Sequence, residues 1–303
     1  MIPEGLPHLH KLIAHQLSAF PDHGSYLRKR FSEQGGAELK FAEGIAKKVI
    51  QIAGDKLDIV CDDYRWLSGV ILDEELYFRR TGRYRLSTFA EADTQVYSNT
   101  SLMARYMNGV LASQLWWRNH TEMLQYFHDD FLAHNARDFR HLEIGPGHGL
   151  FLSLAAGSPN CGSAEAWDIS DASLQSTRSA LDAMHLDREV LLRKAGIFDA
   201  PKGQFTSIVF SEVLEHLERP HDALAILRGL LAEDGRMFLN APVNSPAPDH
   251  LYLFETPEQI LQMIVDAGFI VESSRLAPCT GATLERARKW KLSISVGIIV
   301  RKT

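Results

Sequence analysis

Cysteine is scarce in this sequence, and the few residues present are not spaced as a framework. Cys61, Cys161 and Cys279 are odd in number, lie far apart and form no Cys-x-x-Cys pair. Disulfide-rich folds and thiolate zinc sites need paired, closely spaced cysteines. The sequence therefore argues against both classes, and we expect each thiol to be buried or incidental.

Long apolar runs and excess positive charge are also missing. No apolar stretch approaches the ~18 residues of a membrane span, and the start, MIPEGLPHLHKLIAHQ, lacks the pattern of a secretory signal. The formal charge is −6, from 32 Lys and Arg against 38 Asp and Glu. Because nucleic acids and anionic membranes attract clustered positive charge, we expect a cytoplasmic protein that binds a small molecule, with no nucleic acid and no membrane as partner.

The composition itself is that of an ordinary globular protein, with 45% hydrophobic and 23% charged residues in 303. This length suits two domains. Residues 1–135 predict a mostly helical domain, with helices at 9–20, 37–52 and 102–120. In residues 136–303, short apolar runs alternate with amphipathic stretches, which is typical of an α/β domain. No flexible linker separates the two, so we expect them to pack closely.

The α/β part predicts a parallel sheet of seven strands with helices between them. The expected strands cover residues 141–144, 164–168, 190–193, 205–210, 236–240, 270–276 and 292–300, and the expected helices cover 172–184, 221–231 and 256–267. The last helix has the clearest start, because Thr256 can cap it, Pro257 suits its first turn and Gln259 completes a capping box. Gly268 is expected to end it in the left-handed conformation.

One segment of the helical part has a different pattern. Residues 76–87, LYFRRTGRYRLS, place Thr-Gly between aromatic and aliphatic residues, which predicts a short hairpin after a helix, as in a winged helix. The arginines Arg79, Arg80, Arg83 and Arg85 would suit DNA. Given the acidic total, we favour a solvated or dimer-interface role for them.

The most informative stretch is HLEIGPGHG at residues 141–149. An apolar strand runs into Gly145, Gly147 and Gly149, and a helix can begin after them. Open α/β sheets bind ligands at the carboxyl ends of such strands, and glycines let the backbone turn tightly beside a ligand. A dinucleotide fingerprint would need its third glycine at position 150, where the chain has Leu150, so NAD and FAD are disfavoured.

Two carboxylates flank this turn. Glu143 precedes the first glycine by two residues and suits a ligand with an ammonium group better than one with a pyrophosphate. Asp168 ends the next expected strand, nineteen residues after Gly149, where a carboxylate can accept hydrogen bonds from ribose hydroxyls. Together they favour a nucleotide that carries an amino acid.

Three motifs in this order resemble the class I S-adenosylmethionine-dependent methyltransferases: HLEIGPGHG, the acidic strand end at Asp168, and FTSIVFSEVLEHLERP at residues 205–220. The resemblance covers residues 139–303. It implies a seven-stranded Rossmann-like sheet with helices on both faces, S-adenosylmethionine as cofactor and S-adenosylhomocysteine as product. The residues that it implies for the cofactor are Glu143, Gly145, Gly147 and Gly149 at the methionine part, Asp168 and Ile169 at the ribose, Gly196, Ile197 and Phe198 at the adenine, and Ser211 and Glu212 toward the substrate.

Two positions depart from the family pattern. Gly196 stands where many relatives have an Asp that binds adenine, and Thr206 stands where they have an Asp after the Phe of the fourth strand. The first departure removes the expected adenine acceptor. We expect the second to affect only local structure.

Methyl transfer from a sulfonium depends mostly on positioning and on the exclusion of water. An acceptor hydroxyl or protonated amine would also need a base, and His216, Glu212 and His250 are the candidate catalytic residues. No metal site is expected, because Glu212, Glu215, His216 and His221 match no closed ligand spacing.

The helical part is expected to form a lid over the acceptor, where aromatic side chains can shape a small, partly apolar pocket. The candidate substrate-binding residues are Tyr106, Asn108, Trp117 and Asn119 from this part and Tyr252 from the Pro-rich loop at residues 240–254. The helical front end also resembles the dimerisation domain of small-molecule O-methyltransferases, which implies a homodimer.

Three functions stay open. The leading one is methylation of a small molecule, such as a secondary metabolite, at oxygen, nitrogen or carbon. A second enzyme class would cyclise the aminobutyrate chain of the cofactor and release methylthioadenosine. The third is a winged-helix regulator that senses a ligand.

Overall fold

The second half of the chain forms a single seven-stranded sheet. The computed structural model describes residues 3–32, 34–199 and 203–303. The strands are β1 Phe139–Ile144, β2 Cys161–Asp168, β3 Val190–Lys194, β4 Phe205–Ser211, β5 Leu231–Val243, β6 Phe269–Pro278 and β7 Ile294–Lys302. Their order in the sheet is β3-β2-β1-β4-β5-β7-β6. All seven predicted strands are confirmed, with their ends moved by a few residues.

The direction of the last strand differs from the prediction. β1 to β5 pair in parallel, but β7 runs antiparallel to both β5 and β6. Alternating apolar runs locate strands without giving their direction. The chain returns from β6 to β7 through α12 Leu284–Trp290 and inserts β7 between β5 and β6, so the sheet is mixed.

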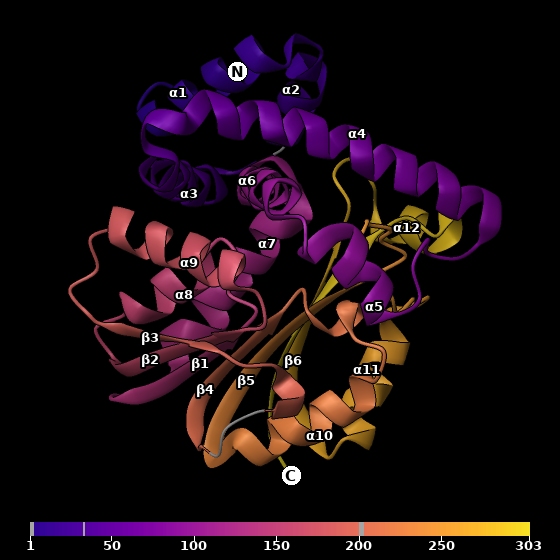
Figure 1. The fold of residues 1–303 in the computed structure, drawn as a ribbon. Helices are drawn as coiled ribbons and strands as arrows, with labels where there is room; N and C mark the ends of the chain where they lie inside the picture. The colour runs from indigo at the N-terminus through magenta and orange to yellow at the C-terminus, as the bar shows by residue number, and fades with distance from the viewer. Residues whose placement is uncertain (1–2, 33, 200–202) are drawn as a thin grey trace.

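Helices cover both faces of the sheet, as expected (Figure 1). On one face α7 Arg118–Tyr126 packs on β6 and β7, and α8 Leu150–Ala156 and α9 Asp171–Ala183 pack on β1 to β3. On the other, α10 Pro220–Leu230 packs on β5, and α11 Pro257–Asp266 packs on β6 and β7. The capping box at Thr256 is confirmed, and Gly268 has a φ of 82°.

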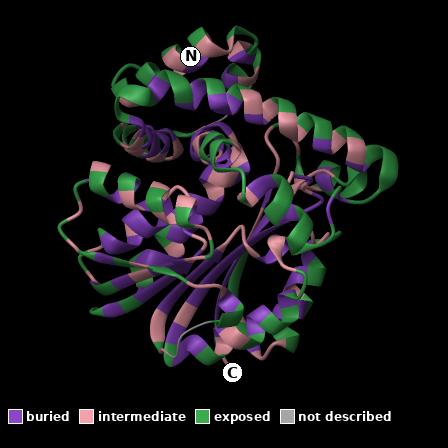
Figure 2. Ribbon diagram, in the orientation of Figure 1, coloured by how far each residue is buried: buried purple, intermediate pink, exposed green. Residues whose placement is uncertain are grey.

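The helical front end lies across the edge of this layer. Its helices are α1 Pro7–Ala19, α2 Gly24–Ser32, α3 Gly36–Ala53, α4 Leu57–Thr81, α5 Phe89–Ala92 and α6 Thr100–Trp116. α3 and α6 both pack against α9. One apolar core runs from Leu9 through Trp116 to Phe238 and Ile299 of the sheet, and the central strands of the sheet are mostly buried (Figure 2). The domain division at residue 135 stays a prediction, because α7 lies before it and packs on the sheet.

The predicted hairpin at residues 76–87 is wrong. α4 continues to Thr81, and Gly82 ends it with a φ of 70°. The Thr-Gly pair therefore closes a helix as a left-handed C-cap instead of turning a hairpin. Residues 83–88 contain no strand, so the front end has no wing.

Two of the four arginines of that segment bind other parts of the protein. Arg79 donates to the backbone carbonyl of Trp290 at 2.6 Å, which ties the far end of α4 to α12. Arg85 pairs with Glu74 at 2.8 Å. These internal partners engage Arg79 and Arg85, whereas Arg80 and Arg83 are exposed.

The predicted helix at residues 102–120 is two helices. The chain leaves helical geometry at Trp117, with φ −91° and ψ 121°, and restarts as α7. Thr121 donates its hydroxyl to the carbonyl of Gln114 at 2.7 Å, which satisfies a carbonyl that the end of α6 leaves free. Neither Gly nor Pro marks this break, so the sequence pattern carried no signal for it.

All three cysteines are free; Cys61 and Cys161 are buried and Cys279 is half-buried. Within residues 3–32, 34–199 and 203–303, no helix is both long and apolar enough to cross a membrane.

Candidate active site

The turn after β1 has a backbone that glycine adopts far more readily than other residues. Gly145, Gly147 and Gly149 have φ values of 67°, 49° and 71°, all in the left-handed region. A Cβ at Gly145 would lie 2.8 Å from Cγ2 of Val213, which follows β4. The turn therefore lies against the segment that leaves β4, at the carboxyl ends of two paired strands.

The helical front end contacts this turn through α6. A Cβ at Gly147 would be 3.5 Å from Sδ of Met107 in α6. From α9, the Thr177 hydroxyl donates to the carbonyl of Gly147 at 2.8 Å. Met107 and Thr177 thus enclose the turn between α6 and α9.

Glu143 lies directly before the turn and is unusual in its surroundings. Its side chain is buried, with 3% of the residue exposed, and Oε2 has no hydrogen-bond partner among the described residues. Nε2 of His141 lies 3.8 Å from this oxygen. Burial raises the pKa of Glu143 well above its ordinary range, and burial lowers the pKa of His141 to about 3. The neutral imidazole leaves this carboxyl group without a countercharge.

Asp168 ends β2 and has two partners at the start of α9. Oδ1 accepts from the backbone N–H of Ser170 at 2.9 Å, and Oδ2 accepts from the Ser173 hydroxyl at 2.6 Å. Burial raises the pKa of Asp168, and these hydrogen bonds oppose the rise. Each carboxylate oxygen can accept a further bond, so Asp168 supports α9 and keeps acceptor capacity for a ligand.

The loops after β2 and β3 each present an exposed apolar side chain. Ile169, after β2, is 46% exposed and Phe198, after β3, is 40% exposed, whereas Ile197 is buried. A Cβ at Gly196 would lie 3.2 Å from Cγ2 of Ile169 and 3.7 Å from Oδ2 of Asp199. Asp199 therefore places a carboxylate beside the position where Gly196 lacks one. Sequence reasoning missed this residue because it looked for the carboxylate at Gly196 itself.

Ser211 and Glu212 leave the end of β4 beside Asn240 of β5. The Asn240 amide donates to Oγ of Ser211 at 3.2 Å and to Oε1 of Glu212 at 2.7 Å. Glu212 has a φ of 54°, and its N–H donates to the carbonyl of Asn240 at 2.8 Å. Burial raises the pKa of Glu212 to about 7. A strained backbone and two contacts with Asn240 thus fix this side chain.

Asp249, in the loop after β5, accepts hydrogen bonds from the hydroxyls of two tyrosines of the front end. Tyr106 of α6 donates to Oδ1 at 3.0 Å, and Tyr97, in the π-helical turn Asp93–Tyr97, donates to Oδ2 at 3.3 Å. Burial, followed by the charge of Asp249, raises the pKa of both tyrosines well above the ordinary value. Of these three residues, sequence reasoning had selected only Tyr106.

The three candidate bases converge at this place. The rings of His216 and His250 lie 4.8 Å apart and perpendicular, and Nε2 of each faces Oε1 of Glu215, at 3.7 and 3.9 Å respectively. Glu212 precedes Glu215 by one turn and is close enough for its charge to raise the pKa of Glu215, to which burial contributes most. His250 comes to this cluster from a loop 35 positions further along the chain than Glu215.

The other candidate substrate residues have partners elsewhere. Tyr252 is half-buried, and its N–H donates to the carbonyl of Glu215 at 2.9 Å. The remaining three bind within the front end or the sheet: Asn108 to Asp63 at 2.9 Å, Trp117 to the hydroxyl of Tyr64 at 3.0 Å, and Asn119 to the hydroxyl of Ser295 at 3.0 Å.

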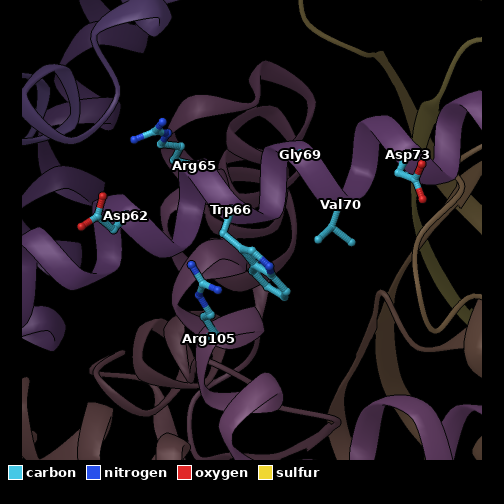
Figure 3. Close-up of a pocket in the computed structure, with 7 residues that line it drawn as sticks. All are labelled: Asp62, Arg65, Trp66, Gly69, Val70, Asp73 and Arg105. Atoms are coloured by element: carbon cyan, nitrogen blue, oxygen red, sulfur yellow. The ribbon is translucent and has the colours of Figure 1, made fainter.

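A groove of about 640 Å³ follows the outer side of α4 (Figure 3). It is lined by Arg105 of α6 and by Asp62, Arg65, Trp66, Gly69, Val70 and Asp73 of α4. The Arg105 guanidinium lies 4.7 Å from the centre of the Trp66 ring. This groove belongs to the front end and adjoins neither the glycine turn nor the cluster around Glu215.

Two solved O-methyltransferase structures are similar in fold to most of this chain. An O-methyltransferase family protein from Burkholderia thailandensis matches with a TM-score of 0.57 at 14% identity, over 82% of this chain and 73% of that one. The mitomycin 7-O-methyltransferase MmcR matches with a TM-score of 0.55 at 13% identity, over 84% and 73%. Because residues 136–303 are little more than half of the chain, both matches extend into the helical front end.

No curated protein matches this sequence. The family model described as "Methyltransferase domain" matches residues 116–278, which is more than half of the 303 residues. The match starts at the end of α6 and includes the glycine turn, Asp168 and the segment after β4. The resemblance drawn from three sequence motifs is confirmed: the chain belongs to the methyltransferase-domain family, with the class I Rossmann-like fold.

Proposed function

We propose that this protein binds S-adenosylmethionine at the carboxyl ends of β1 and β2 and transfers its methyl group to a small molecule. Glu143 carries the proposal. A buried carboxyl group with an unpartnered oxygen is costly, and it lies directly before a turn of three left-handed glycines. The ammonium group of the cofactor's methionine part would give Glu143 the partner that the described residues do not.

The other residues around the turn fit the remaining parts of the cofactor. Asp168 keeps lone pairs for ribose hydroxyls. Ile169 and Phe198 offer exposed apolar surface on the two sides of Gly196, which suits a flat purine ring. Ile197 packs beneath this loop. Asp199 supplies a carboxylate for the exocyclic amine of adenine, in the role that relatives give to an Asp at the position of Gly196.

The chain's own part in the chemistry lies between Ser211 and His250. When bound, S-adenosylmethionine supplies a methyl group on a sulfonium, which an acceptor displaces in line. The buried surroundings exclude water, which matters because positioning and desolvation provide most of the acceleration. Glu212, His216 and His250 stay our candidates to take a proton from the acceptor, and Tyr106 and Tyr252 would border the same space.

A calorimetric titration of Glu143→Gln tests the cofactor assignment. We expect the affinity for S-adenosylmethionine and S-adenosylhomocysteine to fall about 10- to 100-fold, because a charge-assisted hydrogen bond is lost. Methylthioadenosine lacks the amino acid, so its affinity should be the same for both proteins. Equal affinity of wild type and variant for S-adenosylmethionine would remove Glu143 from the site.

Product analysis separates methyl transfer from cyclisation of the cofactor. Methyl transfer to a panel of phenols, amines and carbon acids yields S-adenosylhomocysteine only when an acceptor is present. Release of methylthioadenosine from enzyme and cofactor alone would instead establish the cyclising enzyme.

We also propose a homodimer formed through the front end, as in the O-methyltransferases that the chain resembles. Ile59, Leu72 and Leu76 of α4 are exposed, and α4 lines the outer groove with Trp66. Sedimentation velocity of wild type and Leu72→Glu tests this, since a dimer through α4 should dissociate in the variant, whereas a wild-type monomer would exclude it.

A further inference from the structure

In the cluster of Glu215, His216 and His250, the carboxyl group of Glu215 is buried without hydrogen bonds. It is completely buried, and neither carboxylate oxygen has a hydrogen-bond partner among the described residues. The Nε2 atoms of His216 and His250 lie beyond hydrogen-bond distance of its Oε1, at 3.7 and 3.9 Å. Three potential ligand atoms thus face one another without bonding. They all lie within 4.8 Å of one another.

The backbone fixes the tautomer of both histidines. Nδ1 of His250 lies 2.6 Å from the carbonyl of Ser245, and Nδ1 of His216 lies 3.0 Å from the carbonyl of Asp249. A carbonyl can only accept, so each Nδ1 carries the hydrogen and each Nε2 has a free lone pair directed at Glu215. Metal-binding histidines are held in this way, with one nitrogen on a carbonyl and the other on the ion.

Negative charge around these ligands lacks a cation. Glu212, Glu215 and Asp249 lie together, and within the described part of the chain no Lys or Arg forms an ion pair with any of them. Buried carboxylates are usually paired or bound to a metal. Asp249 is satisfied by the Tyr97 and Tyr106 hydroxyls, and Glu212 by Asn240. Of these three carboxyl groups, Glu215 is the one whose two buried oxygens have no hydrogen-bond partner among the described residues.

We propose that Glu215, His216 and His250 bind a divalent transition-metal ion beside the methyl-transfer site. Two imidazole nitrogens and one carboxylate oxygen suit zinc and iron(II) better than magnesium or calcium. Bonds of about 2.0 to 2.2 Å place ligand atoms roughly 3 to 3.5 Å apart around an ion, so the three side chains need only a small inward movement. Three protein ligands leave open positions, as in catalytic sites.

The proposed metal site lies close to the proposed cofactor site. Val213, two residues before Glu215, is the side chain that a Cβ at Gly145 would meet. An ion here would hold an acceptor oxygen and lower the pKa of its hydroxyl. The proton would pass to Glu212 or to solvent, and the oxygen would form its bond to the methyl carbon while the carbon–sulfur bond breaks and leaves its electron pair on sulfur. This role, unlike ion binding itself, rests on the proposed function.

Metal binding is tested on the full-length protein without cofactor. After treatment with a chelator, the protein is titrated with zinc and, under anaerobic conditions, with iron(II) and cobalt(II), and the bound metal is counted by elemental analysis. We expect one ion per chain, and a cobalt(II) spectrum with nitrogen and oxygen ligands and no thiolate charge-transfer band. Failure of all three ions to bind stoichiometrically would overturn the proposal.

Variants locate the site. We expect His250→Gln and Glu215→Gln each to weaken the ion affinity about 100-fold or more, since a ligand is lost from a set of three. His221→Ala is the matched control, because His221 is an exposed histidine of the same segment and should bind the ion like wild type. A folded double variant His216→Gln/His250→Gln that keeps wild-type affinity would place the metal elsewhere. Should Glu215→Gln not fold, the two histidine variants and the cobalt(II) spectrum decide.

The two proposals fail separately. The metal-free protein should keep its affinity for S-adenosylmethionine and lose methyl transfer, and added metal should restore the transfer. Loss of cofactor binding in Glu143→Gln alone speaks only to the cofactor site. Full methyl transfer by metal-free protein would overturn the role of the ion.

Discussion

The two ends of the proposed active site, its cofactor end and its acceptor end, are built in different ways. The cofactor end is local: Glu143, the glycine turn and Asp168 all belong to β1, α8 and β2 or the turns between them. The acceptor end is assembled from distant segments, since Tyr97 and Tyr106 come from the front end, Glu215 and His216 follow β4, and Asp249 and His250 follow β5. A short motif can specify the first end. The second exists only in the folded protein, and it is here that one enzyme of a fold family differs from another.

The largest effect is expected where the acceptor end is broken. Asp249→Ala removes the acceptor of two buried hydroxyls, those of Tyr97 and Tyr106, and should lower the free energy of unfolding by about 2 to 4 kcal/mol. Methyl transfer should fall with it, because the loop that carries His250 loses its attachment to the front end. Urea unfolding and product assays measure the two effects.

The affinity for S-adenosylmethionine should meanwhile stay within about twofold, since no cofactor residue is touched. Asp249→Asn keeps an acceptor for one tyrosine and should lose less stability than Asp249→Ala. A large loss of cofactor affinity in Asp249→Ala would mean that the two ends are coupled.

A substitution at the cofactor end should instead weaken cofactor binding. Asp168→Ala should weaken binding of S-adenosylmethionine by about 1 to 3 kcal/mol through lost ribose hydrogen bonds, as calorimetry would show. Ser173→Ala is the control, because it removes one of the two contacts of Asp168 at the start of α9 and leaves the carboxylate in place. Unchanged affinity in Asp168→Ala, or an equal loss in Ser173→Ala, would reduce Asp168 to a support for α9.

A smaller effect, on the free energy of unfolding at acid pH, is expected from His23 of the front end. Burial lowers the pKa of His23 to about 4 from 6.5. The unfolded chain therefore takes up a proton below pH 6.5 that the folded chain does not accept until about pH 4, so lower pH favours unfolding. At pH 5 the cost is about 1 to 2 kcal/mol.

His23→Phe should abolish that part of the pH dependence, because Phe can keep the stacking with Phe20 and Tyr26 and does not titrate. Urea unfolding at pH 7.5 and pH 5 compares the two proteins. Should both lose the same stability between these pH values, other groups would account for the acid sensitivity, and His23 would not.

The contrast between the two ends also explains how far the sequence could be used. Strand positions, the capped helix at Thr256 and the glycine turn follow from local patterns, and all are present in the structure. The hairpin prediction failed because Thr-Gly ends a helix and turns a hairpin equally well, and residues 76–87 alone do not decide between them. The break at Trp117 is held by Thr121 and by tertiary packing, which no local signal records.

The same limit applied to the acceptor end. The spacing of Glu215 and His216 relative to neighbours in their own segment matches no metal site. The third proposed ligand, His250, follows a different strand. Only the parallel pairing of β4 with β5 brings the two loops to one edge of the sheet, and neither Tyr97 nor Asp249 belongs to any motif.

The hydrogen bond between Tyr106 and Asp249 joins residues 143 positions apart. The strands β1 to β5 all lie between these two residues in the chain. Closing so long a loop is slow and costly unless the intervening elements have already paired. The acceptor end therefore has no partly folded precursor: a chain in which the glycine turn is complete still lacks a place for its substrate until the sheet has formed and the front helices have docked on it.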